Sequence, residues 1–342
     1  MKKTMRAIGF KKALPIQSES SLFEFKTQIP AIQSRDLLVK IEAISVNPVD
    51  KFTRKAQVEE LAEPKVIGYD AVGTVVKTGD DCSLFKPGDH VFYAGAYDRP
   101  GCDSEYQAVD ERIVGHAPTK LTLAESAAMP LTSLTAWESL FEQMAIDYQD
   151  HKANAKKSIL IINGGGGVGS IATQLAHLAN LQVVTTAGNE KTKEWSKQQG
   201  ADFVLDYHKD LVEQAHEIGF NDFDYILELT NLDQYWPIIT KLIAPLGNVV
   251  STTGSGKELD FSPLKSKMIR FGWEWMYFKS WFQRDMESQH QILEQVRQWL
   301  DEGKLTTTLT KTITPINAAN LRKATELIET NHTLGKIVLT DW

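Results

Sequence analysis

Residues 158–169 read SILIINGGGGVG, and this stretch decides the fold. The apolar run Ser158–Asn163 is typical of a buried strand, and apolar residues then recur at the spacing of one helix face. Between strand and helix, Gly164, Gly166 and Gly169 form the pattern GxGxxG, with Gly167 and Val168 inside it. Glycine lets the backbone turn tightly and approach a pyrophosphate, whose charge the N–H groups of the helix N-terminus can bind. The stretch predicts a dinucleotide-binding turn; the alternative is a flexible glycine loop between core elements.

Strand and helix patterns alternate after this turn, which predicts parallel βαβ units and a doubly wound sheet in an α/β protein. The expected strands are 182–186, 203–207, 225–230 and 248–253, and the expected helices are 190–199, 211–218 and 235–243. The aromatic run 267–278 could add one more strand. Beyond it we expect helices over 288–300 and 318–330, and a last strand at 336–339.

The sequence before residue 130 has a different character, with short apolar runs separated by Gly, Pro and Asp. A β-rich head, a βαβ middle and a mixed tail predict an interrupted domain in which head and tail fold together. We place the boundaries at 1–128, 129–280 and 281–342, since 342 residues suffice for two domains.

Composition narrows the class of protein. Hydrophobic residues make up 42% and charged residues 24%, as in ordinary globular proteins, and the formal charge of −7 argues against a nucleic-acid-binding protein. No apolar run is long enough to span a membrane, and the basic start lacks the apolar segment of a signal peptide. Two cysteines, Cys82 and Cys102, are too few for a disulfide scaffold and fit a reducing cytoplasm.

The strand that ends at Thr186 indicates which dinucleotide binds. A site for NAD usually has an acid there to hold the ribose 2′-hydroxyl, but Thr185–Asn189 contains none, and Glu190 comes late enough to open the next helix. Lys191 and Lys193 follow, and Tyr207 ends the third strand. This pattern favours a 2′-phosphate and hence NADPH, although either lysine alone could belong to a solvated helix face. Thr252 and Thr253 end a later strand, where a bound dinucleotide passes.

Six segments, in order, resemble the medium-chain dehydrogenase/reductase superfamily in its quinone oxidoreductase and zinc-type alcohol dehydrogenase-like branch. The matching segments are Asn47–Asp50 (NPVD), Gly68–Gly73 (GYDAVG), Lys86–Asp89 (KPGD), Leu134–Trp137 (LTAW), Gly164–Gly169 and Gly335–Leu339 (GKIVL). The resemblance implies a GroES-like catalytic domain built from both ends of the chain, a Rossmann domain between them, and a nicotinamide cleft where they meet. It also implies a homodimer through the edge that Phe271–Phe278 would occupy; burial of these aromatic residues in the core is the alternative.

Whether this chain binds zinc is a separate question, because the superfamily includes true zinc enzymes. A catalytic zinc needs three protein ligands. In zinc relatives the ligands lie where this chain has Asn47, Asp50 and Tyr69, and its histidines are scattered, with His90 placed at a strand start. We therefore expect no metal site.

Without a metal, the remaining chemistry is hydride transfer from NADPH to a quinone or an α,β-unsaturated carbonyl, which accepts charge on oxygen. In this hypothesis Asn47 and Thr135 hold the nicotinamide side of the site, Tyr69 donates to a substrate oxygen, and Asp50 orders the loop more than it acts as a base. Tyr69 could equally be a packing residue. Two alternatives stay open: a zinc alcohol dehydrogenase with displaced ligands, and a dinucleotide-binding protein with a regulatory or structural role and little turnover.

Overall fold

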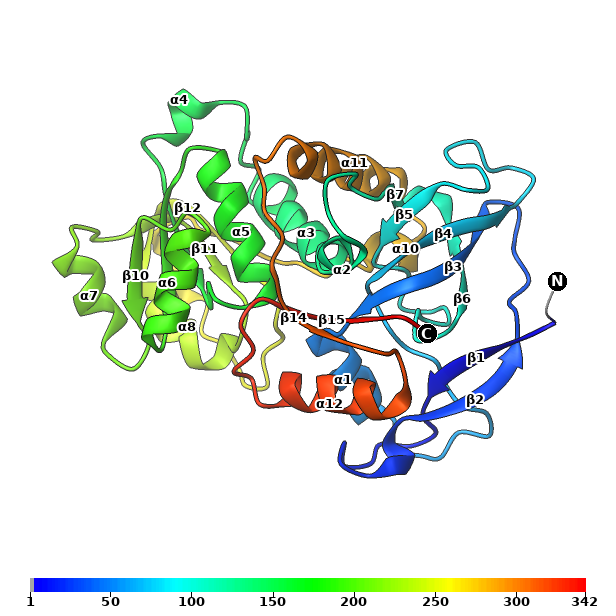
Figure 1. Ribbon diagram of the computed structural model, residues 1–342. Coiled ribbons are helices and arrows are strands. Elements are labelled where there is room, and N and C mark those ends of the chain that lie inside the picture. The colour runs from blue at the N-terminus through cyan, green and yellow to red at the C-terminus, as the bar shows by residue number, and fades with distance from the viewer. Residues whose placement is uncertain (1–2) are drawn as a thin grey trace. The chain divides into compact units, whose positions relative to one another are not determined.

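The computed structural model describes residues 3–342 and divides them into two compact units (Figure 1). Residues 3–134 and 277–342 make the first unit, and residues 135–276 make the second. The expected boundaries at 128/129 and 280/281 lie a few residues from these. Head and tail do fold together, because the last strand pairs with a strand of the head.

The second unit contains a six-stranded parallel sheet. Its order, β10-β9-β8-β11-β12-β13, reverses direction at the first strand, β8, as in a Rossmann sheet. The strands are β8 (Ser158–Ile162), β9 (Gln182–Ala187), β10 (Phe203–Asp206), β11 (Phe223–Glu228), β12 (Ile243–Ser251) and β13 (Arg270–Trp273). The connecting helices are α5 (Gly167–Leu178), α6 (Glu190–Gln198), α7 (Leu211–Glu217), α8 (Leu232–Leu242) and the short α9 (Ser262–Ser266), and α4 (His151–Asn154) precedes β8.

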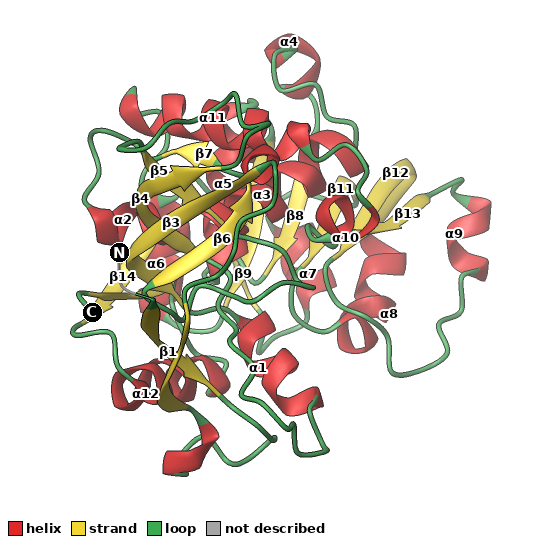
Figure 2. Ribbon diagram, turned by 90° about the vertical axis from the view of Figure 1, so that its right-hand side faces the viewer, coloured by secondary structure: helices red, strands yellow, loops and turns green. Residues whose placement is uncertain are grey.

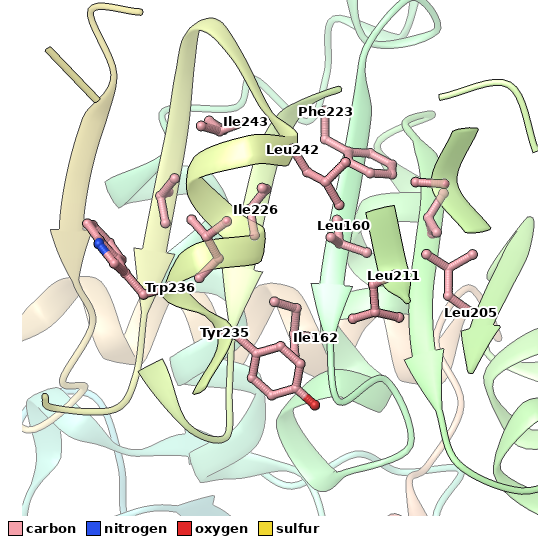
Figure 3. Close-up of a cluster of buried hydrophobic side chains, with 14 of the residues drawn as sticks. Leu160, Ile162, Leu205, Leu211, Phe223, Ile226, Tyr235, Trp236, Leu242 and Ile243 are labelled. Atoms are coloured by element: carbon pink, nitrogen blue, oxygen red, sulfur yellow. The ribbon is translucent and has the colours of Figure 1, made fainter. Parts of the chain in front are cut away.

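The core of this unit follows from the alternation of side chains along each strand. Leu160 and Ile162 of β8 and Ile226 of β11 point to one face, where α7 and α8 cover them. Figure 3 shows this cluster, with Tyr235 and Trp236 of α8 beside the strands. The alternate residues of β8 face the opposite side, against which α5 packs. Because β8 is buried on both faces, its sequence is a continuous apolar run.

The first unit is built on a mainly antiparallel sheet of order β14-β15-β3-β4-β5-β7, with β6 also paired to β3 (Figure 2). Its strands are β3 (Asp36–Ser45), β4 (Ala71–Thr78), β5 (His90–Tyr93), β6 (Tyr106–Asp110), β7 (Gly115–His116), β14 (Leu309–Ile313) and β15 (Lys336–Thr340), and β1 (Thr4–Gly9) and β2 (Phe23–Gln28) form a separate hairpin. The helices are α1 (Pro48–Ala56), α2 (Leu123–Ala127), α3 (Pro130–Trp137), α10 (Phe278–Phe282), α11 (Glu287–Asp301) and α12 (Ala318–Glu329). The boundary between the units falls inside α3.

Most expected elements are present, with ends shifted by a few residues. The aromatic run 267–278 is the main difference, because only Arg270–Trp273 pairs with β12, while Phe278 begins α10. This run therefore serves as an edge strand, a connection and a helix in turn. Within residues 3–342 no helix is both long and apolar enough to cross a membrane.

Candidate active site

The glycine turn joins β8 to α5, as its sequence predicts. A side chain at Gly169 would place its Cβ 2.1 Å from the Asn163 carbonyl oxygen, and one at Gly164 would come within 2.5 Å of the Thr185 Cβ. These two glycines are therefore required by the packing of the turn. At Gly166 a Cβ would meet only the flexible amide of Asn163, at 2.9 Å. Gly166 precedes α5 without a side-chain cap, so the first N–H groups of the helix, at Gly167, Val168 and Gly169, remain available for an anion.

The end of β9 carries no acid, and α6 begins at Glu190, as expected. The surroundings of Glu190 do not favour ribose binding, since its side chain is highly exposed and forms an ion pair with Lys193 at 2.9 Å. Lys191 is exposed, and no carboxylate among residues 3–342 pairs with it. The Tyr207 ring lies against Gly188, where an added Cβ would come within 2.2 Å of the phenol oxygen. A cationic and a phenolic group thus flank the end of β9.

A buried carboxylate organises the ends of β11 and β12. Glu228 accepts hydrogen bonds from the backbone N–H groups of Thr230 and Asn231, at 2.6 and 2.5 Å, and from the hydroxyls of Ser251 and Thr253, both at 2.7 Å. The Thr253 hydroxyl also accepts from the Leu232 N–H group at 3.1 Å. The side chain of Thr253 therefore holds the loop together, and Thr252, whose backbone N–H donates to the Glu228 carbonyl, lies beside it partly exposed.

Thr135 opens the second unit on α3. Its side chain is buried, and its carbonyl oxygen accepts from the Ser139 hydroxyl at 2.7 Å. The helix continues as a π-helical segment, Glu138–Gln143. Such segments are rare and often lie at functional sites.

In the first unit, a lysine ammonium lies inside the protein. Lys336 of β15 donates to Asp70 at 2.8 Å, to the Val46 carbonyl at 3.2 Å, and to the Oδ1 atom of Asn47. The Asn47 amide nitrogen in turn donates to Asp70 at 2.8 Å and to the Tyr69 carbonyl at 3.1 Å. The other Asp70 oxygen accepts from the Leu131 N–H group at 2.7 Å. Burial raises the pKa of Asp70 above its ordinary value, while Lys336 lowers it.

Asn47 also precedes α1, whose third residue, Asp50, accepts from the Asn47 backbone N–H at 2.6 Å. This bond holds the start of the helix, so Asp50 does order the loop. Burial raises the pKa of Asp50 to about 7, against the lowering effect of that bond and of Lys336.

Aromatic rings gather beside Asp50. Tyr69 is buried and stacks on Tyr97 with 5.8 Å between ring centroids, and it meets Tyr277 edge-on at 5.3 Å. Tyr97, which is partly exposed, also lies 6.0 Å from the exposed ring of Trp281. Burial raises the pKa of Tyr69, and the negative charge of Asp50 adds to this effect, so the phenol keeps its proton. Tyr97 is thus the phenol of this cluster that reaches the surface.

Comparison with known proteins places these features in a family. The profile of the "Zinc-binding dehydrogenase" family matches residues 199–339, and that of the "Alcohol dehydrogenase GroES-like domain" matches residues 33–137. A "Zinc-type alcohol dehydrogenase-like protein" of Staphylococcus aureus is 40% identical over 337 residues, which cover 98% of this chain and 99% of the relative. The chain belongs to the medium-chain dehydrogenase/reductase superfamily.

Solved structures and more distant relatives agree with that assignment. A crystal structure of a protein from Rhizobium etli is 40% identical, with a TM-score of 0.94 over 100% of this chain and 99% of that chain. The quinone oxidoreductase of Coxiella burnetii is 25% identical, with a TM-score of 0.82 over 99% of this chain and 100% of that chain. An "NADPH-dependent alkenal/one oxidoreductase" of Arabidopsis thaliana is 28% identical over 91% of this chain and 73% of the relative. As a member of this superfamily the protein is an oxidoreductase that uses a nicotinamide dinucleotide and a small-molecule substrate.

The superfamily names raise the question of zinc, and the donor set does not fit it. Where zinc relatives have ligands, Asn47 is engaged by Lys336 and Asp70, and Tyr69 is a neutral phenol. Burial holds the pKa of Cys102 well above its ordinary value, and its thiol donates to the Asp70 carbonyl. Among residues 3–342 no three His, Cys, Asp or Glu side chains are grouped so that they could hold a metal ion. A lysine ammonium supplies the positive charge at this position instead.

Several residues of this dehydrogenase/reductase site were not identified from the sequence. The sequence identifies Lys336 only as part of the motif GKIVL, although a lysine inside an apolar strand suggests a buried charge. Tyr97 lies in the loop 93–106, which the sequence offers as a source of pocket residues without singling out this tyrosine. Glu228 could have been suspected, since it is an acid at the end of a buried strand.

Replacing Lys336 with Met should destabilise the first unit by about 3–5 kcal/mol, because Asp70 would remain buried without its cation. Denaturant unfolding monitored by circular dichroism measures this. The double variant Lys336→Met/Asp70→Asn is the control and should recover most of the loss. A loss below about 1 kcal/mol in the single variant would show that the buried pair does not hold the fold.

Asp50→Asn should change how stability depends on pH. The raised pKa means that the folded protein binds more protons than the unfolded chain between about pH 4 and pH 7. The free energy of unfolding of the wild type, relative to that of the variant, should therefore fall as the pH rises through this window and level off above it. Asn keeps the acceptor for the Asn47 N–H group, so α1 should still form. Parallel curves for the two proteins from pH 4 to 8 would contradict the assignment.

Proposed function

We propose that this protein is an NADPH-dependent reductase that transfers hydride to a quinone or an α,β-unsaturated carbonyl compound without zinc. The observation that carries the proposal is the Lys336 ammonium, which donates hydrogen bonds to the Asn47 Oδ1 atom and to Asp70. Alcohol oxidation in this fold relies on a metal to acidify the alcohol. A conjugated carbonyl or quinone is already electron-poor and needs only orientation and hydrogen-bond donors.

The second unit supplies the cofactor site in this proposal. The N–H groups at Gly167, Val168 and Gly169 bind the pyrophosphate, and Lys191 and Tyr207 bind the 2′-phosphate. Thr135, Thr252 and Thr253 line the rest of the dinucleotide site. When bound, the cofactor supplies the hydride. The name of the Arabidopsis relative, which includes NADPH and alkenals, supports both the cofactor and the acceptor class.

The first unit supplies the donors. Asn47 and Asp50 hold the start of α1 in place, and the phenols of Tyr69 and Tyr97 form a neutral, proton-bearing wall that suits a flat acceptor whose oxygen gains charge. Tyr69 is buried and stacks on Tyr97. A proton from the Tyr69 phenol would therefore reach the substrate either through the Tyr97 phenol or past the edge of its ring.

We also propose a cytoplasmic homodimer. Two free cysteines fit a reducing compartment. The edge strand β13 pairs on one side only within residues 3–342, and Trp273, Trp275 and Phe278 are 54%, 42% and 50% exposed. An exposed edge with large apolar side chains is typical of a protein interface.

Lys191→Ala should weaken NADPH binding by about tenfold and leave NADH binding unchanged, because one charge-assisted contact to the 2′-phosphate is lost. Isothermal titration calorimetry with both coenzymes measures this. Lys193→Ala is the matched control and should have a smaller effect, since Lys193 is already paired with Glu190. An equal loss for both coenzymes would exclude a 2′-phosphate contact.

Chelator-treated protein should oxidise NADPH in the presence of quinones, enals or enones, followed by the loss of nicotinamide absorbance, and should not oxidise simple alcohols with NADP⁺. Stoichiometric zinc in the purified protein, with activity lost on chelation, would instead support a zinc alcohol dehydrogenase. Tight NADPH binding with no turnover of any acceptor would support a binding protein.

A further inference from the structure

Tyr97 lies in the loop between β5 and β6, and four other side chains of the first unit hold its ring in place. It stacks on Tyr69 with 16° between the ring planes, and its centroid lies 5.5 Å from that of Tyr277 and 6.0 Å from that of Trp281. The Thr53 hydroxyl donates a hydrogen bond to its phenol oxygen at 3.3 Å. Tyr97 is nevertheless partly exposed. A phenol that is both accessible and fixed is preorganised for binding, because little side-chain entropy remains to be lost.

The phenol group of Tyr97 is placed to act as a donor. In the bond with Thr53 it is the acceptor, so that bond uses a lone pair of the phenol oxygen and not the phenol proton. Tyr69, by contrast, is only 1% exposed. Of the two phenols in the proposed site, Tyr97 is therefore the one that can meet a substrate oxygen directly.

Trp281 extends the aromatic surface from α10. Tyr277 and Trp281 are four residues apart, the spacing that places two side chains on one face of a helix, and both rings meet Tyr97. Tyr277 is buried, whereas Trp281 is 45% exposed. Tyr97 and Trp281, which we call the aromatic subsite, are thus adjacent accessible rings with 53° between their planes. Such a pair of rings suits a flat, apolar ligand.

The charges around the aromatic subsite favour an uncharged ligand. Asp98, the residue after Tyr97, is exposed and would repel an anion. Every lysine and arginine within two residues of Thr53, Tyr69, Tyr97, Tyr277 or Trp281 in the chain already has a partner: Lys51 bonds Asn331, Arg54 and Lys55 bond Glu329, Arg99 bonds Asp36, and Lys279 bonds Ser288. The subsite therefore offers aromatic rings and a neutral donor, and not a cation for a carboxylate, sulfonate or phosphate group.

We propose that the aromatic subsite binds a neutral quinone of two fused rings, and that Tyr97 is a catalytic residue that donates its phenolic proton to the quinone oxygen. An acceptor whose oxygen meets the Tyr97 phenol can place its second ring against Trp281. Tyr69 and Thr53 are positioning residues, since they hold the Tyr97 ring and its oxygen. This inference rests on the proposed function and narrows its acceptor to one class.

The atoms and electrons of the reaction balance. The quinone gains a hydride, that is two electrons and one hydrogen, from NADPH and becomes a hydroquinone anion. The O–H bond of Tyr97 breaks as the second O–H bond of the hydroquinone forms. Because donor and product are both phenols, this proton transfer has a small driving force in either direction. The Tyr97 phenolate then recovers a proton from solvent, to which its side chain is partly exposed.

Tyr97→Phe tests the donor, because Phe keeps the stacked ring but has no proton to give. With menadione, a neutral two-ring quinone, kcat should fall by about 100-fold while KM stays nearly unchanged. The solvent deuterium isotope effect on kcat should fall with it. Tyr69→Phe should cost less, and Tyr106→Phe, at a partly exposed tyrosine of β6, is the matched control and should change neither quantity. An unchanged kcat in Tyr97→Phe, or a larger loss in Tyr69→Phe, would overturn the assignment of the donor.

Trp281→Ala tests the second ring of the subsite. It should raise KM for menadione by about tenfold and leave KM for hexenal, an acyclic alkenal, unchanged. Trp281→Phe should recover most of the loss, because it restores an aromatic ring. Phe282→Ala is the matched control, since Phe282 lies on the same helix and is 56% exposed, but its ring contacts Phe278. Equal changes for menadione and hexenal, or none for either, would contradict stacking on Trp281.

Isothermal titration calorimetry with NADP⁺ present tests the subsite without turnover. The wild type should bind menadione about tenfold more tightly than a naphthoquinone sulfonate, which has the same two rings and a negative charge. Trp281→Ala should remove most of the menadione affinity. Equal affinities for the two quinones, or for wild type and variant, would refute the subsite.

Circular dichroism shows whether each variant folds, and Trp281→Leu takes the place of Trp281→Ala if the smaller side chain prevents folding. Absence of NADPH oxidation by the wild type with every acceptor would refute the proposed function and the donor role of Tyr97. The calorimetric comparison would then still decide whether Tyr97 and Trp281 bind a neutral two-ring quinone.

Discussion

Lys336 extends its ammonium into the interior of the first unit, where it contacts Asp70, Asn47 and the Val46 carbonyl. These residues come from the last strand, the segment before β4 and the turn before α1. A buried charge of this kind is stable only if all of its donors are satisfied, which fixes the three segments relative to one another. Since Asp50 is bonded to Asn47, the same contact also fixes the start of α1, and with it Thr53 and the rings beyond.

Glu228 plays a comparable part in the second unit. It gathers two backbone N–H groups and two hydroxyls at the carboxyl ends of β11 and β12. The carboxyl edge of a doubly wound sheet is where dinucleotides bind, so a rigid loop there holds the binding surface in one shape. Each unit thus contains a buried charged residue that connects distant backbone segments, one a cation and the other an anion.

The ammonium in the first unit also changes the available chemistry. A metal at this position would polarise an oxygen directly, whereas an ammonium that is fully engaged by the protein acts only on its own ligands. In the proposed reaction, activation of the acceptor depends on neutral donors, and the two phenols of Tyr69 and Tyr97 with the Thr53 hydroxyl are the groups that the fold provides.

The sequence alone determined the parts that depend on neighbouring residues. The order of strands and helices, the glycine turn and the opening of α6 at Glu190 all follow from local periodicity and from what a single turn requires of its backbone. Only the tertiary structure decided the pairing of Lys336 with Asp70 and the burial of Tyr69 beneath Tyr97. The partners of each pair are far apart in the chain, and burial and charge compensation depend on which segments the fold brings together.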